Sequence, residues 1–339
     1  MAKFLLRRLA SYLVFVVVSA TFGYFLAASA LNPRATFEGR NPPPPEASVD
    51  QVLDELNLND KTPTAERFLT WIGGAVRGDL GKTLGGEPVA AELGRRIRVT
   101  LRLLVVGSVL GAVLGVLVGV VTAVFRHRCS DHVATLLSFL VLSTPIFLLA
   151  VLLKIGAVQL NRAAGTTVLY YVGEATPGLE GGWWQLAADR LQHLALPTLA
   201  IVLGQVAFYS RYQRGAMLDV LGSDFVRAAQ AKGLRRHQAL LRHGLRGALI
   251  PMTTLFAYQF GLLVTGATFV ETIFGWHGMG AWFVDAVHGN DVNVVVAVTV
   301  VAAVLVLAAG MLADLAHAAL DPRLRAGSRG GMPASTVLS

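Results

Sequence analysis

The sequence predicts an all-α protein that crosses a membrane six times. Of its 339 residues, 54% are hydrophobic and only 15% are charged, whereas a typical soluble domain has about 25% charged residues. Six stretches run for about 18 residues or more without an Asp, Glu, Lys or Arg, the length of a membrane-spanning helix. Basic residues gather in alternate connections between these stretches. Together these observations exclude an ordinary soluble enzyme and a disordered chain.

The six predicted spans use fewer than half of the residues, so loops make up the remainder. The first span resembles a signal peptide, because basic residues precede it and Ala28-Ser29-Ala30 ends it. Its apolar run is longer than the roughly 7 to 15 residues of a signal-peptide core, which favours a retained helix. In chain order, the predicted spans are 9–31, 103–125, 132–153, 191–210, 247–270 and 292–313.

Positive charge predicts the orientation of the chain. Lys and Arg in short loops favour the cytoplasmic side. The segment 211–246 has eight such residues against two acids, and the N-terminus, the loop after the second span and the C-terminal tail are also basic. Six spans place these four segments on one side, so we expect both termini to be cytoplasmic. The net charge of +8 then reflects topology and anionic lipid, and not nucleic acid.

The spans divide the chain into four parts. Residues 1–31 form a cytoplasmic N-terminus and the first helix, and 32–98 form an extracytoplasmic loop with short helices near 49–58 and 68–76. A membrane core follows over 99–320, and a cytoplasmic tail over 321–339. Arg95, Arg96 and Arg98, at the end of the long loop, run against the positive-inside rule. Long loops are translocated largely regardless of their charge, which weakens this objection.

No stretch of the sequence carries an evident catalytic site. Gly81-Lys82-Thr83 resembles the end of a phosphate-binding loop, but Val76 occupies the position that this loop reserves for its first glycine. The eight histidines are scattered, and Cys129 is the single cysteine, so neither a metal site nor an intrachain disulfide is expected. We therefore expect no enzyme activity and no cofactor in this chain.

Glycines and prolines within the spans predict how the helices pack. Gly107, Gly111, Gly115 and Gly119 recur every four residues, so they share one helix face that another backbone can approach closely. Prolines within or at the start of spans bend a helix, which suits either a packing kink or a hinge beside a translocation path. They are Pro145, Pro197 and Pro251.

Polar residues inside the spans are candidates for a translocation path, because polar groups at membrane depth usually face a cavity or a partner. Hydrogen bonding between helices is the alternative. No acidic residue lies in the middle of a span, which argues against a proton-driven carrier. The pore candidates are Gln205, Thr254, Tyr258, Gln259 and Thr265, of which the second, third and fifth share a helix face.

The segment 219–246 is the most informative cytoplasmic stretch. It is too polar to cross the membrane and too long for a simple turn. Ser223 or Asp224 can begin a two-turn helix, and Gly233 can end it in a left-handed conformation. Such a helix either docks in a groove of another protein or lies on the lipid surface.

Several motifs resemble those of one family. Residues 224–234, followed by Arg242-His243 and Leu249-Ile250-Pro251, resemble the EAA loop of ATP-binding-cassette (ABC) importer permeases, in the form found in the peptide/nickel branch, with Arg227 where the motif has its glutamate. Residues 77–81, 271–280 and 320–323 match further motifs of this family in the same order. The likeness covers nearly the whole chain and is strongest to B-type permease subunits of oligopeptide transporters.

This resemblance implies a type I importer permease fold in a bacterial plasma membrane. The chain would pair with a second, similar permease to form a peptide pore. Two ATPase subunits or domains would bind ATP and magnesium, and an extracytoplasmic peptide-binding lipoprotein would deliver the peptide. A permease for nickel or another small solute, and less readily a secondary carrier, are the alternatives.

The resemblance also assigns two groups of residues. The ATPase-coupling residues would be Asp224, Phe225, Arg227, Ala228, Ala229, Lys232 and Gly233, within the loop 219–246. The candidates for an outer gate would be Glu271, Phe274, Trp276, Gly278 and Gly280.

Overall fold

A computed structural model of this chain describes residues 2–39, 41, 42 and 44–320, and every regular element in this part is a helix. Six of these helices are long and apolar enough to cross a membrane. This confirms the predicted all-α class and the number of spans. The six are α1 (Ala2–Ala30), α5 (Val89–Val124), α7 (Ile146–Ala164), α8 (Trp183–Leu221), α11 (Leu245–Phe274) and α13 (Val292–Leu320).

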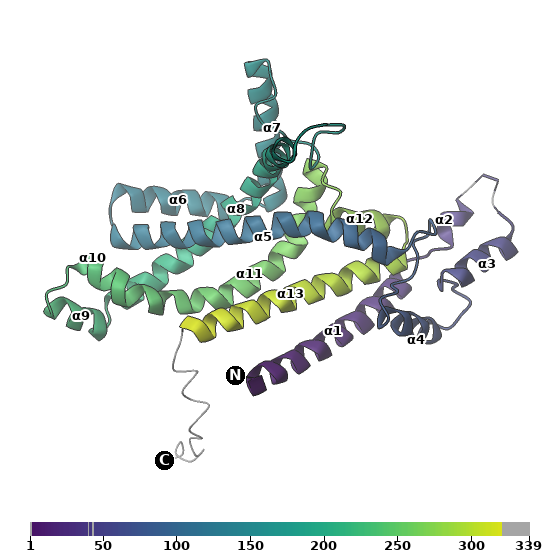
Figure 1. Ribbon diagram of the computed structural model, residues 1–339, viewed down its shortest axis with the longest axis horizontal. Helices are drawn as coiled ribbons and strands as arrows, with labels where there is room; N and C mark the ends of the chain where they lie inside the picture. Colours follow the sequence, from purple (N-terminus) through teal and green to yellow (C-terminus); the bar gives the residue numbers. More distant parts are fainter. Residues whose placement is uncertain (1, 40, 43, 321–339) are drawn as a thin grey trace, which may run out of the picture.

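Helices α1, α5, α11 and α13 run side by side and give the molecule two distinct ends (Figure 1). At one end, Arg8 Nε lies 2.7 Å from Asp314 Oδ2, which joins the start of α1 to the end of α13. The short helices α9 (Asp224–Ala231) and α10 (Arg236–Ala239) project from the same end. The described ends of the chain and the basic segment thus lie together, as the charge pattern requires. The assignment of this end to the cytoplasm stays a prediction, and the tail 321–339 lies outside the described residues.

The tightest helix packing is between α5 and α8, at the predicted glycine face. A Cβ atom at Gly111 would lie 2.4 Å from Gln205 Cβ, and one at Gly115 would lie 2.6 Å from Tyr209 Cβ. Distances this short leave no room for a side chain, so glycine allows the backbones to approach. The prediction of a packing face is confirmed at Gly107, Gly111, Gly115 and Gly119.

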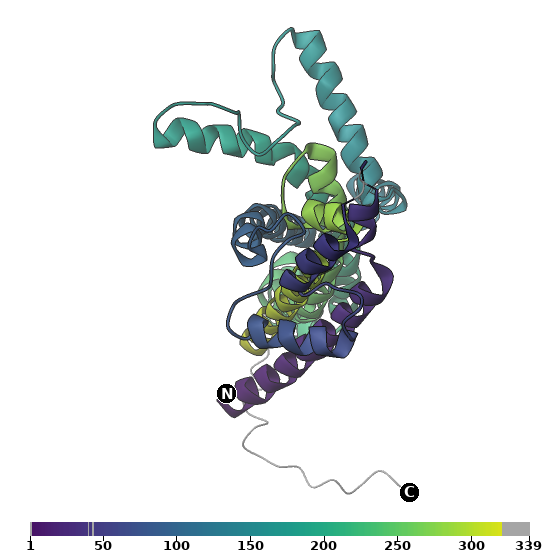
Figure 2. The same ribbon diagram turned by 90° about the vertical axis from the view of Figure 1, so that its right-hand side faces the viewer.

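The third predicted span, 132–153, is wrong as a single helix. The structure contains two helices there, α6 (Cys129–Ser143) and α7, separated by an extended Thr144. Pro145 causes the break, because proline disfavours a helical conformation in the residue before it. Pro197 and Pro251 lie inside the continuous helices α8 and α11. Figure 2 shows α7 and the start of α8 standing away from the other long helices.

The segment between α1 and α5 folds against the opposite end of the bundle. It contains α2 (Ala35–Glu38), α3 (Glu46–Glu55) and α4 (Thr64–Ala75). Trp71 of α4 packs on Tyr24 of α1, with ring centroids 5.6 Å apart. Lys61 Nζ lies 2.6 Å from Asp50 Oδ2, and this contact holds the pKa of Asp50 below its usual range. Helix α5 then begins at Val89, directly after Pro88, so it includes the last part of the expected loop 32–98.

Candidate functional site

A short exposed helix, α9, lies at the end of the bundle that carries the start of α1 and the end of α13. It ends as the sequence predicts, because Gly233 has a φ of +93°, a conformation that glycine adopts without strain. The Gly233 amide donates to the Gln230 carbonyl at 2.9 Å, and the Leu234 amide donates to the Ala229 carbonyl at 3.3 Å. This pair of bonds closes the last turn of the helix.

The two faces of α9 have different surroundings. Val226 and Ala229 are buried against the residues that follow the helix, around Ala239. Ala229 therefore packs against this chain itself and is unavailable to a groove of a partner. This differs from the expectation that Ala229 is one of the ATPase-coupling residues. The exposed coupling candidates are Asp224, Arg227, Ala228, Lys232 and Gly233, and the Phe225 side chain lies outside what the structure describes.

A π-helical turn connects the segment of α9 and α10 to the membrane helix α11. This turn, η1 (Leu240–Gly244), follows α10 directly and continues into α11 without a loop. A Cβ atom at Gly244 would lie 2.7 Å from Val220 Cγ1 of α8, so the turn is pressed against that helix. Turns of this type occur frequently at functional sites within helices. A displacement at this end of the molecule would thus reach α11 directly.

The pore candidates divide into two groups. Thr254, Tyr258 and Thr265 lie on one exposed face of α11, as their spacing predicts, and Tyr258 is 60% exposed. Gln205 and Gln259 are buried instead. The Gln205 Oε1 atom has no hydrogen-bond partner among the described residues. The exposed face of α11 is therefore the better candidate for a translocation surface, and the two glutamines belong to helix packing.

The largest concentration of hydrogen bonds among the gate candidates is at the far end of α11. Glu271 is fully buried, and its Oε2 atom accepts hydrogen bonds from the Gly280 and Ala281 amides at 2.9 and 3.0 Å. These amides open helix α12 (Met279–His288). The Thr100 hydroxyl of α5 donates to Glu271 Oε1 at 2.5 Å and accepts from the Met279 amide at 2.7 Å. The carboxylate thus joins α5, α11 and α12.

Two glycines make room for this carboxylate. A Cβ atom at Gly278 would lie 2.4 Å from Glu271 Cδ, and one at Gly280 would lie 3.0 Å from Glu271 Oε2. The contacts of Glu271 with Thr100, Gly280 and Ala281 form what we call the Glu271 joint. Phe274 and Trp276 are buried beside this joint. The structure therefore brings the five gate candidates together, as a closed joint and not as an open surface.

The sequence did not single out Thr100, which completes the joint. It lies 171 residues from Glu271 in the chain, so no local spacing connects the two. A threonine next to an apolar run was the only available signal, and that signal is common. Its role depends on the packing of α5 against α12.

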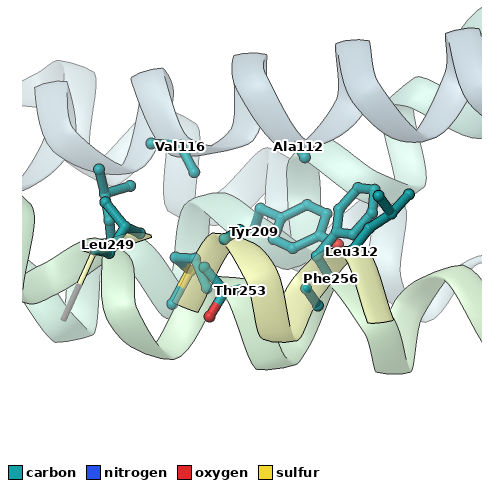
Figure 3. A pocket seen from close by; sticks show the side chains of 11 residues that line it. Ala112, Val116, Tyr209, Leu249, Thr253, Phe256 and Leu312 are labelled. Atoms are coloured by element: carbon teal, nitrogen blue, oxygen red, sulfur yellow. The ribbon is translucent and has the colours of Figure 1, made fainter. Parts of the chain in front are cut away.

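An apolar cavity of about 330 Å³ lies between α5, α8, α11 and α13 (Figure 3). Among its eleven lining residues, Tyr209 and Thr253 carry hydroxyl groups and the other side chains are apolar. A peptide backbone requires many hydrogen-bonding partners, which this lining does not provide. The cavity is consequently a poorer candidate for a peptide path than the exposed face of α11.

The comparison with known families supplies the identity of the fold. Residues 115–326 match the sequence model of the binding-protein-dependent transport system inner membrane component. The chain belongs to this family. The matched residues include α9, the exposed face of α11 and Glu271. Members are multi-pass plasma-membrane permeases, and a binding-protein-dependent importer works with ATPase and substrate-binding partners.

Similar proteins match this family member along nearly its whole length. It is 52% identical over 325 residues to the oligopeptide transport system permease protein OppB of Mycobacterium tuberculosis, covering 96% of this chain and 99% of the relative. It is 33% identical over 345 residues to the dipeptide transport system permease protein DppB of Escherichia coli, with 96% and 99% covered. It is also 33% identical to the oligopeptide transport system permease protein AppB of Bacillus subtilis, with 82% and 85% covered.

Proposed function

We propose that this chain is a pore-forming permease subunit of an ATP-driven importer that carries oligopeptides or dipeptides across a bacterial plasma membrane. The observation that carries the proposal is the exposed helix α9, which continues through α10 and η1 into α11. Relatives named as oligopeptide and dipeptide permeases match 96% of this chain, which supports peptide as the solute.

In this proposal, ATP and magnesium are bound by two ATPase subunits or domains and not by this chain. Arg227 and Lys232 are exposed on α9, so they suit an ATPase groove with acidic walls. Arg227 Nη1 lies 3.7 Å from Asp224 Oδ1, a separation that leaves the guanidinium free to bind a closer acid. Docking would place the ATPases at the end of the bundle that holds the start of α1 and the end of α13.

A second, similar permease would complete the pore. Helix α7 stands away from the bundle (Figure 2), and only 11% of an 18-residue apolar stretch of this helix is buried within the chain. An apolar arm of this kind requires lipid or another membrane helix around it. A partner permease facing α11 would enclose Thr254, Tyr258 and Thr265 between the two subunits. A peptide-binding lipoprotein would approach the opposite end, near α2–α4 and α12.

The fold suggests how ATP hydrolysis would move the pore. Closure of the ATPases would displace α9, and η1 would pass the displacement to α11. The Glu271 joint connects the far end of α11 to α12 and α5, so α12 would move with it. Access to the pore would then alternate with the state of the nucleotide, since each ligand shifts the same conformational equilibrium.

The substitution Gly233→Val tests this coupling. Valine is strained at a φ of +93°, so the turn after α9 would distort and less peptide would be imported for each ATP hydrolysed. The measurement is uptake of a labelled peptide and ATP hydrolysis by the complete transporter in vesicles. Gly222→Val is the matched control, because Gly222 precedes α9 with a φ of −84° that valine can adopt.

Three results would contradict the proposal. If Gly233→Val imported as much peptide for each ATP hydrolysed as the unchanged protein, the turn after α9 would have no role in coupling. Uptake of nickel but not of labelled peptide would show that the transported solute is nickel and not a peptide. Peptide uptake without ATP would indicate a secondary carrier.

A further inference from the structure

Four arginines line a pocket at the end of the bundle that holds α2–α4. Arg95, Arg98 and Arg102 come from the first part of α5, and Arg190 approaches from α8. The pocket has a volume of about 760 Å³. Under the predicted topology it lies on the outer side, where the positive-inside rule disfavours arginine in short loops. This concentration of charge has no role in the proposed transport cycle.

Two of the four guanidinium groups remain uncompensated. Arg102 Nη2 lies 2.5 Å from Glu174 Oε2, and Arg95 pairs with Glu92. Arg98 and Arg190 have no carboxylate within 4.0 Å among the described residues. The Arg98 Nε atom donates to the Gly94 carbonyl at 2.9 Å, which holds its side chain along α5. The pocket therefore presents two exposed cations to an anionic ligand.

Glu174, which pairs with Arg102, is also part of the lining. The other lining residues are apolar side chains of α5: Val99, Leu101, Val105 and Val106. From Val105, an exposed apolar stripe at four-residue spacing continues through Val109, Val113 and Leu117 in the second half of α5. A water-filled path would require polar groups on such a stripe, whereas acyl chains require none.

Aromatic residues place the pocket at the membrane surface. Trp183 and Trp184 begin α8 and are 79% and 65% exposed. Exposed tryptophans of membrane helices lie at the level of the lipid headgroups. Because Arg190 is on the same helix two turns later, the uncompensated arginines lie near this level.

We propose that this pocket binds one anionic phospholipid. Arg98 and Arg190 hold the phosphate, since guanidinium groups match phosphate oxygens in geometry and charge. The acyl chains lie along the valine and leucine stripe of α5. This inference requires only that α5 spans the membrane, so it holds whichever solute the transporter carries.

The test measures lipid binding to the assembled transporter. Purified in detergent, it is titrated with phosphatidylglycerol while bound lipid is counted by native mass spectrometry and the melting temperature is followed. We expect phosphatidylglycerol to bind and to raise the melting temperature more than phosphatidylcholine does. In the double variant Arg98→Gln with Arg190→Gln, phosphatidylglycerol should bind about 10- to 30-fold more weakly, because each arginine near a phosphate contributes about 1 kcal/mol.

A matched control removes two exposed arginines that lie outside the pocket. The double variant Arg77→Gln with Arg162→Gln should bind phosphatidylglycerol as the unchanged protein does. Equal binding in the Arg98/Arg190 variant would overturn the proposal, as would equal binding of phosphatidylcholine. Stabilisation by glycerol phosphate alone, to the same extent as by the lipid, would also overturn it, because the site would then be one for a small anion.

Discussion

At the scale of single residues, one buried carboxylate organises the end of the molecule opposite the chain termini. Glu271 accepts three hydrogen bonds from groups on α5 and α12. A charged group can be buried when its oxygens are all satisfied in this way. Gly278 and Gly280 permit the geometry, because any larger residue would occupy the space of the carboxylate.

Replacement of Glu271 by alanine should destabilise the transporter. The Gly280 and Ala281 amides and the Thr100 hydroxyl would lose their acceptor, and each buried donor left unpaired costs about 1–3 kcal/mol. Glu271→Gln keeps one oxygen that can accept from the two amides, so its effect should be smaller. The measurement is the melting temperature in detergent, with Glu66→Ala on the exposed surface of α4 as a control. Equal melting temperatures for Glu271→Ala and the unchanged protein would rule out a stabilising joint.

At the scale of helices, the α5–α8 contact depends on the absence of side chains. The four glycines of α5 lie against α8 at distances that exclude a Cβ atom. The π-helical turn η1 is held against α8 by Gly244 in the same manner. Close backbone packing therefore links the two membrane helices to the segment that enters α11.

Gly111→Ala should separate α5 from α8. Its Cβ atom would lie 2.4 Å from Gln205 Cβ, and overpacking of this kind costs about 1–3 kcal/mol. Thermal unfolding of the purified protein measures the loss. Gly94→Ala is the control on the same helix, because nothing lies within 4 Å of the added atom, and it should leave stability unchanged or raise it slightly. Similar destabilisation by both variants would attribute the effect to the helix itself and not to its packing.

At the scale of the whole molecule, α11 connects three candidate sites. It receives the coupling segment at one end, exposes Thr254, Tyr258 and Thr265 along its length, and carries Glu271 at the other end. This arrangement allows a displacement at the basic end of the bundle to reach the opposite end through one rigid element.

Tyr258→Ala should lower peptide uptake while the transporter still assembles. The ring is 60% exposed on α11, and loss of an aromatic contact worth about 0.5–1.5 kcal/mol changes binding about two- to tenfold. The measurement is initial uptake of a labelled peptide, with co-purification of the partner subunits as the assembly check. Leu136→Ala, which removes an exposed side chain of α6 and leaves the exposed face of α11 unchanged, should have little effect. Unchanged uptake in Tyr258→Ala would assign this face to lipid or to packing.

The sequence by itself determined the class of this protein, because apolar length, charge distribution and the glycine and coupling motifs are local properties of a chain. The break at Pro145 shows the limit of that approach, since an apolar run does not report where the backbone leaves the helix. Only the tertiary structure decided that Gln205, Gln259 and Ala229 face inward, since burial depends on which helix lies opposite. It alone paired Glu271 with Thr100 and placed Arg98 and Arg190 around one pocket, because the proximity of residues far apart in the chain arises from packing and leaves no regular spacing in the sequence.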